Sequence, residues 1–99
     1  METFGEYLRG LRQSRKMRIR KLAAALDIDS STLSKIERNE RQATKAFIPV
    51  IAQLFDIGEK EVAVKFWAEK ITYELRDEAF ALEALKVAEQ EITFLKNKP

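Results

Sequence analysis

Two residue types that carry much of protein chemistry, cysteine and histidine, are absent from this 99-residue chain. Without cysteine, disulfides and thiolate metal sites are excluded, and nothing indicates secretion. No apolar run approaches the roughly 20 residues of a membrane span, and the N-terminus has no apolar core of a signal peptide. We therefore expect a cytoplasmic protein that makes no contact with a membrane.

The same absences argue against catalysis. The sequence offers no histidine or cysteine as nucleophile or general base, and no glycine-rich phosphate loop after a strand. Its carboxylates lie on amphipathic faces beside basic residues. We expect no enzyme activity, no cofactor and no metal.

Positive charge is concentrated in the first half of the chain, although the net charge is only +2. Residues 1–45 hold eleven Lys and Arg against six Asp and Glu, whereas residues 46–99 hold seven against ten. Lys and Arg that neutralise phosphates release condensed counterions, so a basic half is typical of proteins that bind a polyanion. Solvated basic faces are also common, so charge alone does not decide the partner.

Residues 19–38 have the pattern of two short helices joined by a tight turn. In the first half, the apolar side chains that recur on one helical face are Ile19, Leu22, Ala23 and Leu26. Asp27 tolerates the left-handed conformation of a helix end, and Asp29 can accept a hydrogen bond from the free N–H groups that open the next helix. In that next helix, Leu33 and Ile36 form an apolar stripe, and most residues off the stripe are small, polar or cationic. This pattern is a helix-turn-helix whose second helix suits a DNA major groove.

The outward side of the second helix supplies the residues that we expect to read bases, which are Ser30, Ser31, Ser34 and Lys35. Serine hydroxyls are short and can donate or accept at a base edge, while Lys35 can reach O6 and N7 of guanine. An equally weighted alternative is that Ser30 or Ser31 only caps the helix. The sequence alone leaves this choice open.

A dense basic cluster lies at the entry to the first helix of the motif. Its members are Arg15, Lys16, Arg18, Arg20 and Lys21. The first helix of a helix-turn-helix crosses the DNA backbone, so we expect these side chains to contact phosphates. Such contacts set affinity and position, not sequence choice. For any one of these residues, a solvated surface position is the alternative.

The motif and its flanks resemble the lambda-repressor/Cro-type helix-turn-helix family, also called the XRE family. The resemblance covers about 60% of the chain, from about Phe4 to Val62, and several segments match in register. They are residues 8–12 (LRGLR), 21–23 (KLA), 31–38 (STLSKIER) and 51–57 (IAQLFDI). The resemblance implies an all-α fold with a lambda-repressor-like headpiece, and a role as a sequence-specific regulator that binds double-stranded DNA. A helical bundle that has a short inter-helix turn by coincidence is the alternative.

Departures from the family pattern fall at helix ends and at two DNA-facing positions. The family usually has glycine where Asp27, Asn39 and Asp56 stand, and Asp and Asn are the types that tolerate positive φ best after glycine. We therefore expect positive φ at all three positions. The family commonly has glutamine where Ile19 stands, to touch a phosphate, and where Ser30 stands, to read a base. Recognition is then expected to depend more on neighbouring side chains.

The resemblance also implies an ion pair and a phosphate-binding linker. In the family, an arginine matching Arg12 pairs with a glutamate matching Glu37, which ties the first helix to the end of the recognition helix. The alternative is that both are ordinary surface charges. The segment after the recognition helix lies beside the groove in the family, and its candidate phosphate contacts here are Arg38, Arg41, Gln42 and Lys45.

Capping signals place two further helices. Thr3 and Glu6 have the spacing of a capping box, so the first helix is predicted over residues 3–15. Pro49 fits only the first turn of a helix, which predicts a start near Phe47. With 45% apolar residues, the chain can bury a modest all-helical core.

The chain after residue 58 contains good helix formers, and glycine and proline are absent from it up to the last residue. We expect helices over 60–75 and 78–96, the second capped by Asp77, with one continuous helix as the alternative. The predicted domains are a helix-turn-helix DNA-binding domain over residues 1–58 and a C-terminal helical dimerisation segment over residues 59–99.

The C-terminal segment has more apolar residues than one helix face can hide. Alternating spacings of four and three residues separate a series of its apolar residues, which are Ala81, Leu85, Ala88, Ile92 and Leu95. This spacing is typical of the seam of a parallel or antiparallel helix pair. Surplus apolar area marks an interface, and a second copy is the simplest partner because dimers read two half-sites about one DNA turn apart. The residues expected in the dimer interface are Phe66, Trp67, Ile71, Phe80, Leu85, Ala88, Ile92 and Leu95. A monomer whose C-terminal helices fold back onto the headpiece is the alternative.

These features together predict a sequence-specific DNA-binding transcriptional regulator. We expect a homodimeric repressor or autoregulator that binds a two-fold symmetric operator through the second helix of the motif. The alternative is an antitoxin-type protein whose C-terminal helices bind a protein partner and whose DNA binding is autoregulatory. The sequence shows no sensor domain and no evident site for a small-molecule effector.

Overall fold

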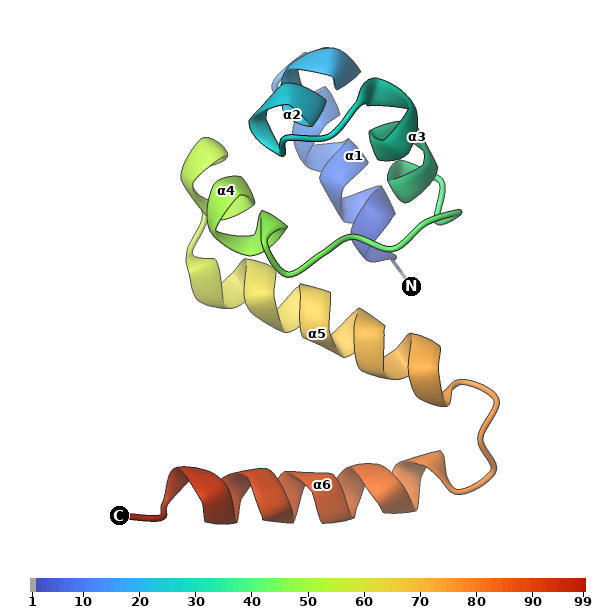
Figure 1. Cartoon of the computed structure of the whole chain (residues 1–99), viewed down its shortest axis with the longest axis vertical. Helices are drawn as coiled ribbons and strands as arrows, with labels where there is room; N and C mark the ends of the chain where they lie inside the picture. Colours follow the sequence, from blue (N-terminus) through green and yellow to red (C-terminus); the bar gives the residue numbers. More distant parts are fainter. Residues whose placement is uncertain (1) are drawn as a thin grey trace. The chain divides into compact units, whose positions relative to one another are not determined.

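Six α-helices and no strand make up residues 2–99, the part of the chain that the computed structural model describes (Figure 1). Their bounds are α1 Phe4–Ser14, α2 Ile19–Ala25, α3 Ser30–Glu37, α4 Phe47–Leu54, α5 Glu59–Leu75 and α6 Ala81–Lys96. The predicted all-α fold is confirmed. The chain divides into two compact units, Met1–Glu69 and Lys70–Pro99, and the division falls inside α5. The first turns of α5 therefore belong to the first compact unit.

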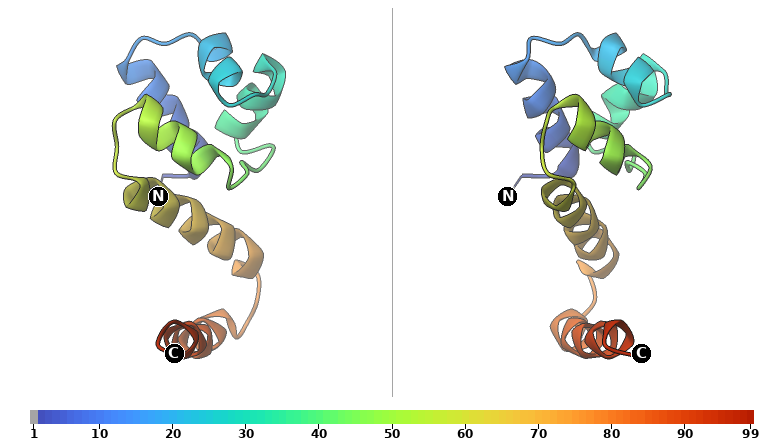
Figure 2. Two further views of the ribbon diagram at one scale, coloured as in Figure 1. Left: turned by 60° about the vertical axis from the view of Figure 1, so that its left-hand side comes forward. Right: turned by 90° about the vertical axis from the view of Figure 1, so that its left-hand side faces the viewer.

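The first unit is built around an apolar core to which five helices contribute. Each of α1 to α5 supplies one side chain that is completely inaccessible to solvent, and these are Leu8, Leu22, Leu33, Ile51 and Val62. Burying an aliphatic side chain of this size stabilises a fold by about 1.5 to 3 kcal/mol. Figure 2 shows α1 to α4 gathered around this core from two further directions. The core thus holds α2 and α3, the two helices of the motif, in one arrangement.

Each of α1 to α4 ends in the same left-handed turn. The residues with positive φ just after these helices are Lys16 (52°), Asp27 (59°), Asn39 (64°) and Asp56 (53°). In every case an amide beyond the turn folds back onto the helix, as where the Ile28 N–H donates to the Ala23 carbonyl at 3.0 Å. These bonds satisfy carbonyl groups that the helix end would leave unpaired. Positive φ at Asp27, Asn39 and Asp56 is confirmed, and Lys16 adds a fourth case that its residue type does not signal.

The predicted starts of α1 and α4 are also confirmed. The hydroxyl of Thr3 accepts a hydrogen bond from the Glu6 N–H at 3.1 Å, and the Glu6 carboxylate accepts one from the Thr3 N–H at 3.1 Å. This reciprocal capping box occupies two N–H groups that have no partner within the helix. The third residue of α4 is Pro49, so its missing N–H falls in the first turn as expected.

The segment after α5 separates two helices, as expected, but the predicted cap is wrong. The helix α6 begins at Ala81 instead of residue 78, and its N-cap position is held by Phe80, which makes no side-chain cap bond. The intervening backbone satisfies itself through turns, since the Glu78 N–H donates to the Leu75 carbonyl at 3.0 Å. The carboxylate of Asp77 lies 3.6 Å from the Arg76 guanidinium instead of capping the helix.

A close approach between α1 and α3 was not signalled by the sequence. A Cβ atom added to Gly5 would lie 2.1 Å from the carbonyl oxygen of Ile36 and 3.1 Å from that of Glu37. Both obstacles are backbone atoms, so only a residue without a side chain allows the helices to approach this closely. By contrast, a Cβ added to Gly10, in the same helix, would meet nothing within 4 Å.

The beginning of α5 is attached to α1. The Phe4 N–H at the start of α1 donates to the Glu69 carboxylate at 2.7 Å, and the Tyr7 hydroxyl donates to the Glu61 carboxylate at 3.2 Å. The rings of Phe4 and Phe66 meet edge to face with centroids 5.5 Å apart. Since α1 also packs on α3, this part of α5 is anchored in the same core as α3.

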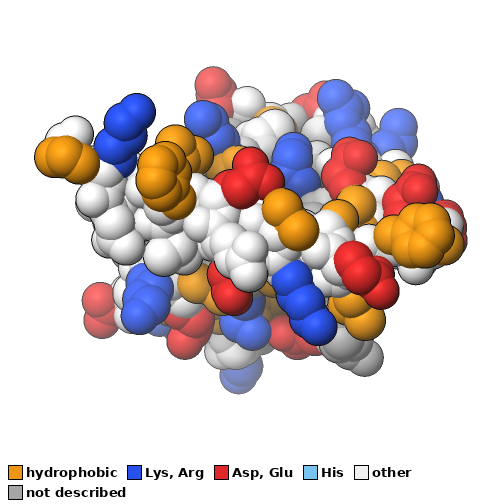
Figure 3. Space-filling model, turned by 90° about the horizontal axis from the view of Figure 1, so that it is seen from below, with side chains coloured by type: hydrophobic (Ala, Val, Ile, Leu, Met, Phe, Trp, Pro, Cys, Tyr) orange, Lys and Arg blue, Asp and Glu red, His pale blue; other side chains and the backbone are white. Residues whose placement is uncertain are grey.

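The second unit has no such core. None of the residues of α6 is buried, and its large apolar side chains are exposed, with relative accessibilities from 36% at Leu85 to 71% at Leu82. Figure 3, which views the chain from below, shows apolar side chains interspersed with acidic and basic ones on this side. Within residues 2–99, no helix combines the length and the apolar character that crossing a bilayer requires.

Candidate nucleic-acid interface

The turn between α2 and α3 has the geometry that the sequence predicts. The left-handed Asp27 reverses the chain after α2, and the carboxylate of Asp29 accepts a hydrogen bond from the Thr32 N–H at 2.7 Å. Bonds from Thr32 and from the Ser31 hydroxyl hold the pKa of Asp29 below its ordinary value, because they stabilise the ionised carboxylate. Asp29 is thus the N-cap of α3, and the helix starts at Ser30.

The two sides of α3 have opposite character. Its inner side buries Leu33, Ile36 and Glu37. The four predicted base-reading residues lie together on the other side, where Ser30, Ser31 and Lys35 are exposed and Ser34 is half-buried. Because Asp29 is the cap, Ser30 is not needed for that role. Ser31 does assist the cap, since its hydroxyl donates to the Asp29 carboxylate at 3.0 Å.

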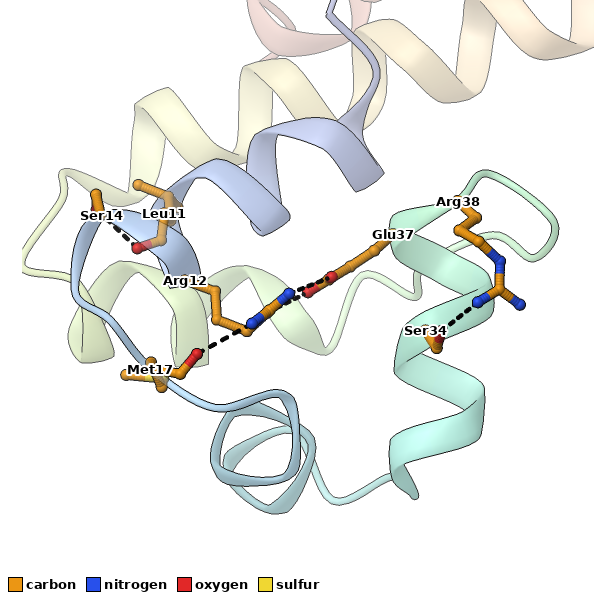
Figure 4. A network of polar contacts seen from close by, with 7 residues as sticks. All are labelled: Leu11, Arg12, Ser14, Met17, Ser34, Glu37 and Arg38. Carbon is orange, nitrogen blue, oxygen red and sulfur yellow. Dashed lines mark hydrogen bonds and ion pairs between the residues drawn. The ribbon is translucent and has the colours of Figure 1, made fainter.

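A polar cluster closes the end of α3. The Nε atom of Arg38 donates to the Glu40 carboxylate at 2.7 Å, and Nη2 donates to its other oxygen at 3.4 Å. Nη1 of the same side chain donates to the hydroxyl of Ser34, one turn back along the helix (Figure 4). The Arg38 guanidinium holds the pKa of Glu40 below its ordinary value through these bonds. The sequence gives only a weak signal for this pair, because Glu40 lies two residues after an arginine at a helix end.

The structure brings together Arg12 and Glu37 in a bidentate ion pair. Nε and Nη2 of Arg12 donate to the two carboxylate oxygens of Glu37 at 2.8 and 2.9 Å, and Nη1 donates to the Met17 carbonyl at 3.0 Å (Figure 4). The Arg12 side chain is 15% exposed and that of Glu37 only 4%. The bond to Glu37 raises the pKa of Arg12 above its ordinary value. The pair ties α1 to the end of α3 and keeps the Glu37 carboxylate away from the outer face of that helix.

The predicted phosphate-binding residues are exposed, but besides Arg38, described above, Arg15 also has side-chain contacts within the chain. Nη2 of Arg15 donates to the Phe55 carbonyl at the end of α4 at 3.0 Å, and its guanidinium lies 5.7 Å from the centre of the Phe55 ring. Arg15 therefore stabilises the end of α4, so a loss of binding on its removal would have two explanations. The other exposed candidates, before and after α3, are Lys16, Arg18, Arg20, Lys21, Arg38, Arg41, Gln42 and Lys45.

The residues predicted for a dimer interface fall into two groups. Phe66 is only 5% exposed and packs against Phe4 inside the first unit, so its surface is already covered. The exposed members are Trp67, Ile71, Phe80, Leu85, Ala88, Ile92 and Leu95. The periodic pattern of the sequence could not separate the two groups, because α5 carries apolar residues on both of its sides.

Comparison with known proteins agrees with this geometry. A family model described as a helix-turn-helix domain matches residues 3–64, which include α1 to α4 and the start of α5. No curated protein and no solved structure matches the chain.

Proposed function

Since the chain belongs to the helix-turn-helix domain family, we propose that it is a sequence-specific transcriptional regulator that inserts α3 into the DNA major groove. The observation that carries the proposal is the division of α3 into a buried apolar side and an exposed side of small, polar and cationic residues. Ser30, Ser34 and Lys35 are the proposed base-reading residues. The lambda-repressor/Cro-type subclass of the family is part of the same proposal.

The phosphate contacts are proposed for exposed basic residues on both sides of α3. Arg18, Arg20 and Lys21 lie at the start of α2, the helix that crosses the backbone in proteins with this motif. Arg41 and Lys45 lie in the irregular segment between α3 and α4. These residues would position α3 without reading sequence.

The experiment is selection of preferred duplexes from random DNA, followed by binding measurements over a range of salt concentrations. Lys35→Ala and Lys21→Ala are matched variants, because both remove an exposed lysine, one from α3 and one from α2. Lys35→Ala should change which bases are preferred, whereas Lys21→Ala should weaken all sequences alike and reduce the salt dependence by about one unit of slope. Equal, sequence-independent losses in both variants would contradict the role of α3.

We further propose that the regulator acts as a homodimer, joined through α6 and the exposed side of α5, and that it represses transcription, including that of its own gene. The support is chemical: α6 exposes a seam of apolar residues that water disfavours, including Ile92 at 53% and Leu95 at 65%. Two copies would present two recognition helices to a symmetric operator.

Matched substitutions on α6 test the seam. Ile92→Ser removes a seam side chain, whereas Phe94→Ser removes a similarly exposed apolar side chain that lies off the seam. In sedimentation equilibrium without DNA, the wild type and the Phe94 variant should be dimeric and the Ile92 variant monomeric. A monomeric wild type whose α6 becomes ordered only with another protein would favour the antitoxin-type alternative.

The charges beside the seam favour a parallel pair. Glu91 precedes Ile92, and Lys96 follows Leu95, which are the flanking positions that meet across a parallel two-helix interface. Glu91 would then face Lys96 of the partner subunit, whereas in an antiparallel pair each flanking position meets its own kind, so Glu91 and Lys96 would not face each other. Lys96→Glu should weaken the dimer, and the exchange Glu91→Lys with Lys96→Glu should restore it. No restoration would contradict the parallel arrangement.

A further inference from the structure

We propose that Arg38 reads a guanine in the operator and that Glu40 is the residue that positions it. This inference rests on the proposed function, because it assumes that α3 lies in the major groove. It replaces the phosphate contact that the sequence predicts for Arg38 with a contact that discriminates between bases.

The direction of the Arg38 side chain is the first observation. Arg38 is the C-cap of α3, but its guanidinium reaches back one turn to the hydroxyl of Ser34 (Figure 4). The charged group therefore lies over the outward side of the helix, on the side that Ser30 and Lys35 share. An arginine that extended away from the helix end would instead reach toward the backbone beside the groove.

Two N–H groups of Arg38 remain available for a further partner. A guanidinium has five N–H groups in a fixed planar arrangement. In Arg38, the Nε group and one group of Nη2 are taken by Glu40, and one group of Nη1 is taken by Ser34. One N–H then remains on each terminal nitrogen. Two neighbouring donors are what O6 and N7 of guanine accept in the major groove.

The charge of Glu40 is the third observation. Its carboxylate lies 2.7 Å from Nε of Arg38, and both side chains are about half exposed. A phosphate bound by Arg38 would bring a second anion close to this carboxylate, and like charges repel. A guanine edge is uncharged, so the paired arginine can bind it without that repulsion. The carboxylate also restricts the rotamers of a long side chain, which reduces the entropy lost on binding.

The test uses the duplex selected by the wild-type chain, together with duplexes in which each base pair is replaced in turn. Arg38→Ala should reduce the preference for one G·C pair in each half-site by about 5- to 150-fold, the range measured for loss of a bidentate base contact. Arg38→Lys retains the positive charge but not the planar pair of donors held by Glu40, so it should lose part of this preference while the salt dependence stays that of the wild type. Arg41→Ala is the matched control, since it removes an exposed arginine from the linker, and it should weaken all duplexes alike.

The variant Glu40→Gln tests whether Glu40 orients the Arg38 side chain or only repels the DNA phosphates by its negative charge. If Glu40 only repels DNA, its removal should strengthen binding to every duplex and leave the base preferences unchanged, which would overturn its positioning role. If Glu40 positions Arg38, the Glu40→Gln variant should discriminate less at the base pair that Arg38 reads and should bind unrelated DNA more tightly. Circular dichroism of each variant verifies that the fold is retained.

Two failures are distinguishable. If the wild-type chain selects a sequence but Arg38→Ala weakens all duplexes alike and lowers the salt slope, Arg38 contacts a phosphate and this inference is overturned alone. If the wild-type chain selects no sequence at all, the proposed function is overturned and this inference with it.

Discussion

The outward sides of α3 and α6 are both exposed to solvent, yet they carry opposite kinds of side chain. The outward side of α3 consists of serines and basic residues, and its inner side is buried in the core of the first unit. In α6 no side is buried, and exposed apolar residues such as Leu82 (71%) and Phe94 (68%) are interspersed with charged ones. Exposure on α3 is compatible with water and with a polyanion. Exposed apolar side chains on α6 are unfavourable in water, and the proposed dimer would cover them.

The two helices also differ in what stabilises them. The short α3 has eight residues, too few for a stable isolated helix, and is held by its buried side, by the Asp29 cap and by the Glu37 ion pair. The longer α6 has 16 residues but no buried side chain. Stability of α3 should thus depend on residues within the chain, and stability of α6 on association. The following predictions test this difference, from the largest expected effect to the smallest.

Matched leucine truncations should separate the two regions most clearly. Leu33→Ala in α3 removes a completely buried side chain, which typically costs about 2 to 5 kcal/mol of unfolding free energy. Leu95→Ala in α6 removes a side chain that is 65% exposed, so in dilute protein it should cost less than about 0.5 kcal/mol. Urea unfolding at two protein concentrations measures both. The cost of Leu95→Ala should rise with concentration, because association is linked to stability; a large cost independent of concentration would mean that α6 is stabilised within one chain.

The buried ion pair between Arg12 and Glu37 should contribute nearly as much to the unfolding free energy. Glu37→Gln leaves the guanidinium of Arg12 without its charged partner, and breaking a buried pair costs about 3 to 5 kcal/mol. We expect about 3 kcal/mol, because Arg12 keeps its bond to Met17 and some contact with water. Thermal unfolding measures this loss. Glu40→Gln is the control, since it opens an exposed pair and should change the midpoint little. Equal shifts in the two variants would contradict the structural role of the inner pair.

The close approach of α1 and α3 predicts an asymmetry between two glycines. Gly5→Ala would place its Cβ against the Ile36 carbonyl and should destabilise the first unit by about 1 to 3 kcal/mol or more. Gly10 lies in the same helix, but a Cβ added there would meet nothing within 4 Å. Gly10→Ala should therefore raise the unfolding free energy of the first unit by about 0.5 to 1 kcal/mol. Chemical unfolding of the two variants is the measurement. If both substitutions stabilised the chain, the two helices would be farther apart than the structure has them.

The attachment of α5 to α1 predicts a small effect at high pH. Burial, followed by the hydrogen bond to Glu61, raises the pKa of Tyr7 to about 12. The neutral phenol is favoured in the fold, so its contribution to stability is present below the unfolded pKa of about 10 and is lost as the pH rises through 12. In a Tyr73→Phe background, tyrosinate absorbance should rise near pH 12. Glu61→Gln should lower that midpoint, and a midpoint near 10 before the substitution would show that Tyr7 is not held against α5.

Much of the first unit was predictable because its signals are local. The apolar spacing at Leu22 and Leu33, the cap at Asp29 and the positive φ at Asp27 all follow from a few neighbouring residues. The approach at Gly5 was not predictable, because it depends on a backbone carbonyl 31 residues away. The prediction that Phe66 lies on the surface, in a dimer interface, was wrong for the same reason. Its partner Phe4 lies at the other end of the first unit in the sequence.

The candidate site shows the same limit. The sequence predicted which residues face outward on α3, because helical periodicity determines it. It could not show that Arg15 is bonded to Phe55, or that Arg38 is shared between Ser34 and Glu40, because these contacts depend on the directions of long side chains. Both findings change which variants are informative in a DNA-binding experiment.

The most direct test of the account is the change in backbone amide NMR shifts when the full chain binds its selected duplex. The amides of Ser30–Glu37 and of the linker that follows should shift strongly, while those of Ala81–Lys96 should keep their positions. The opposite pattern, with strong shifts in α6 and none in α3, would contradict the claim that the serine-bearing side of α3 is the surface that receives DNA.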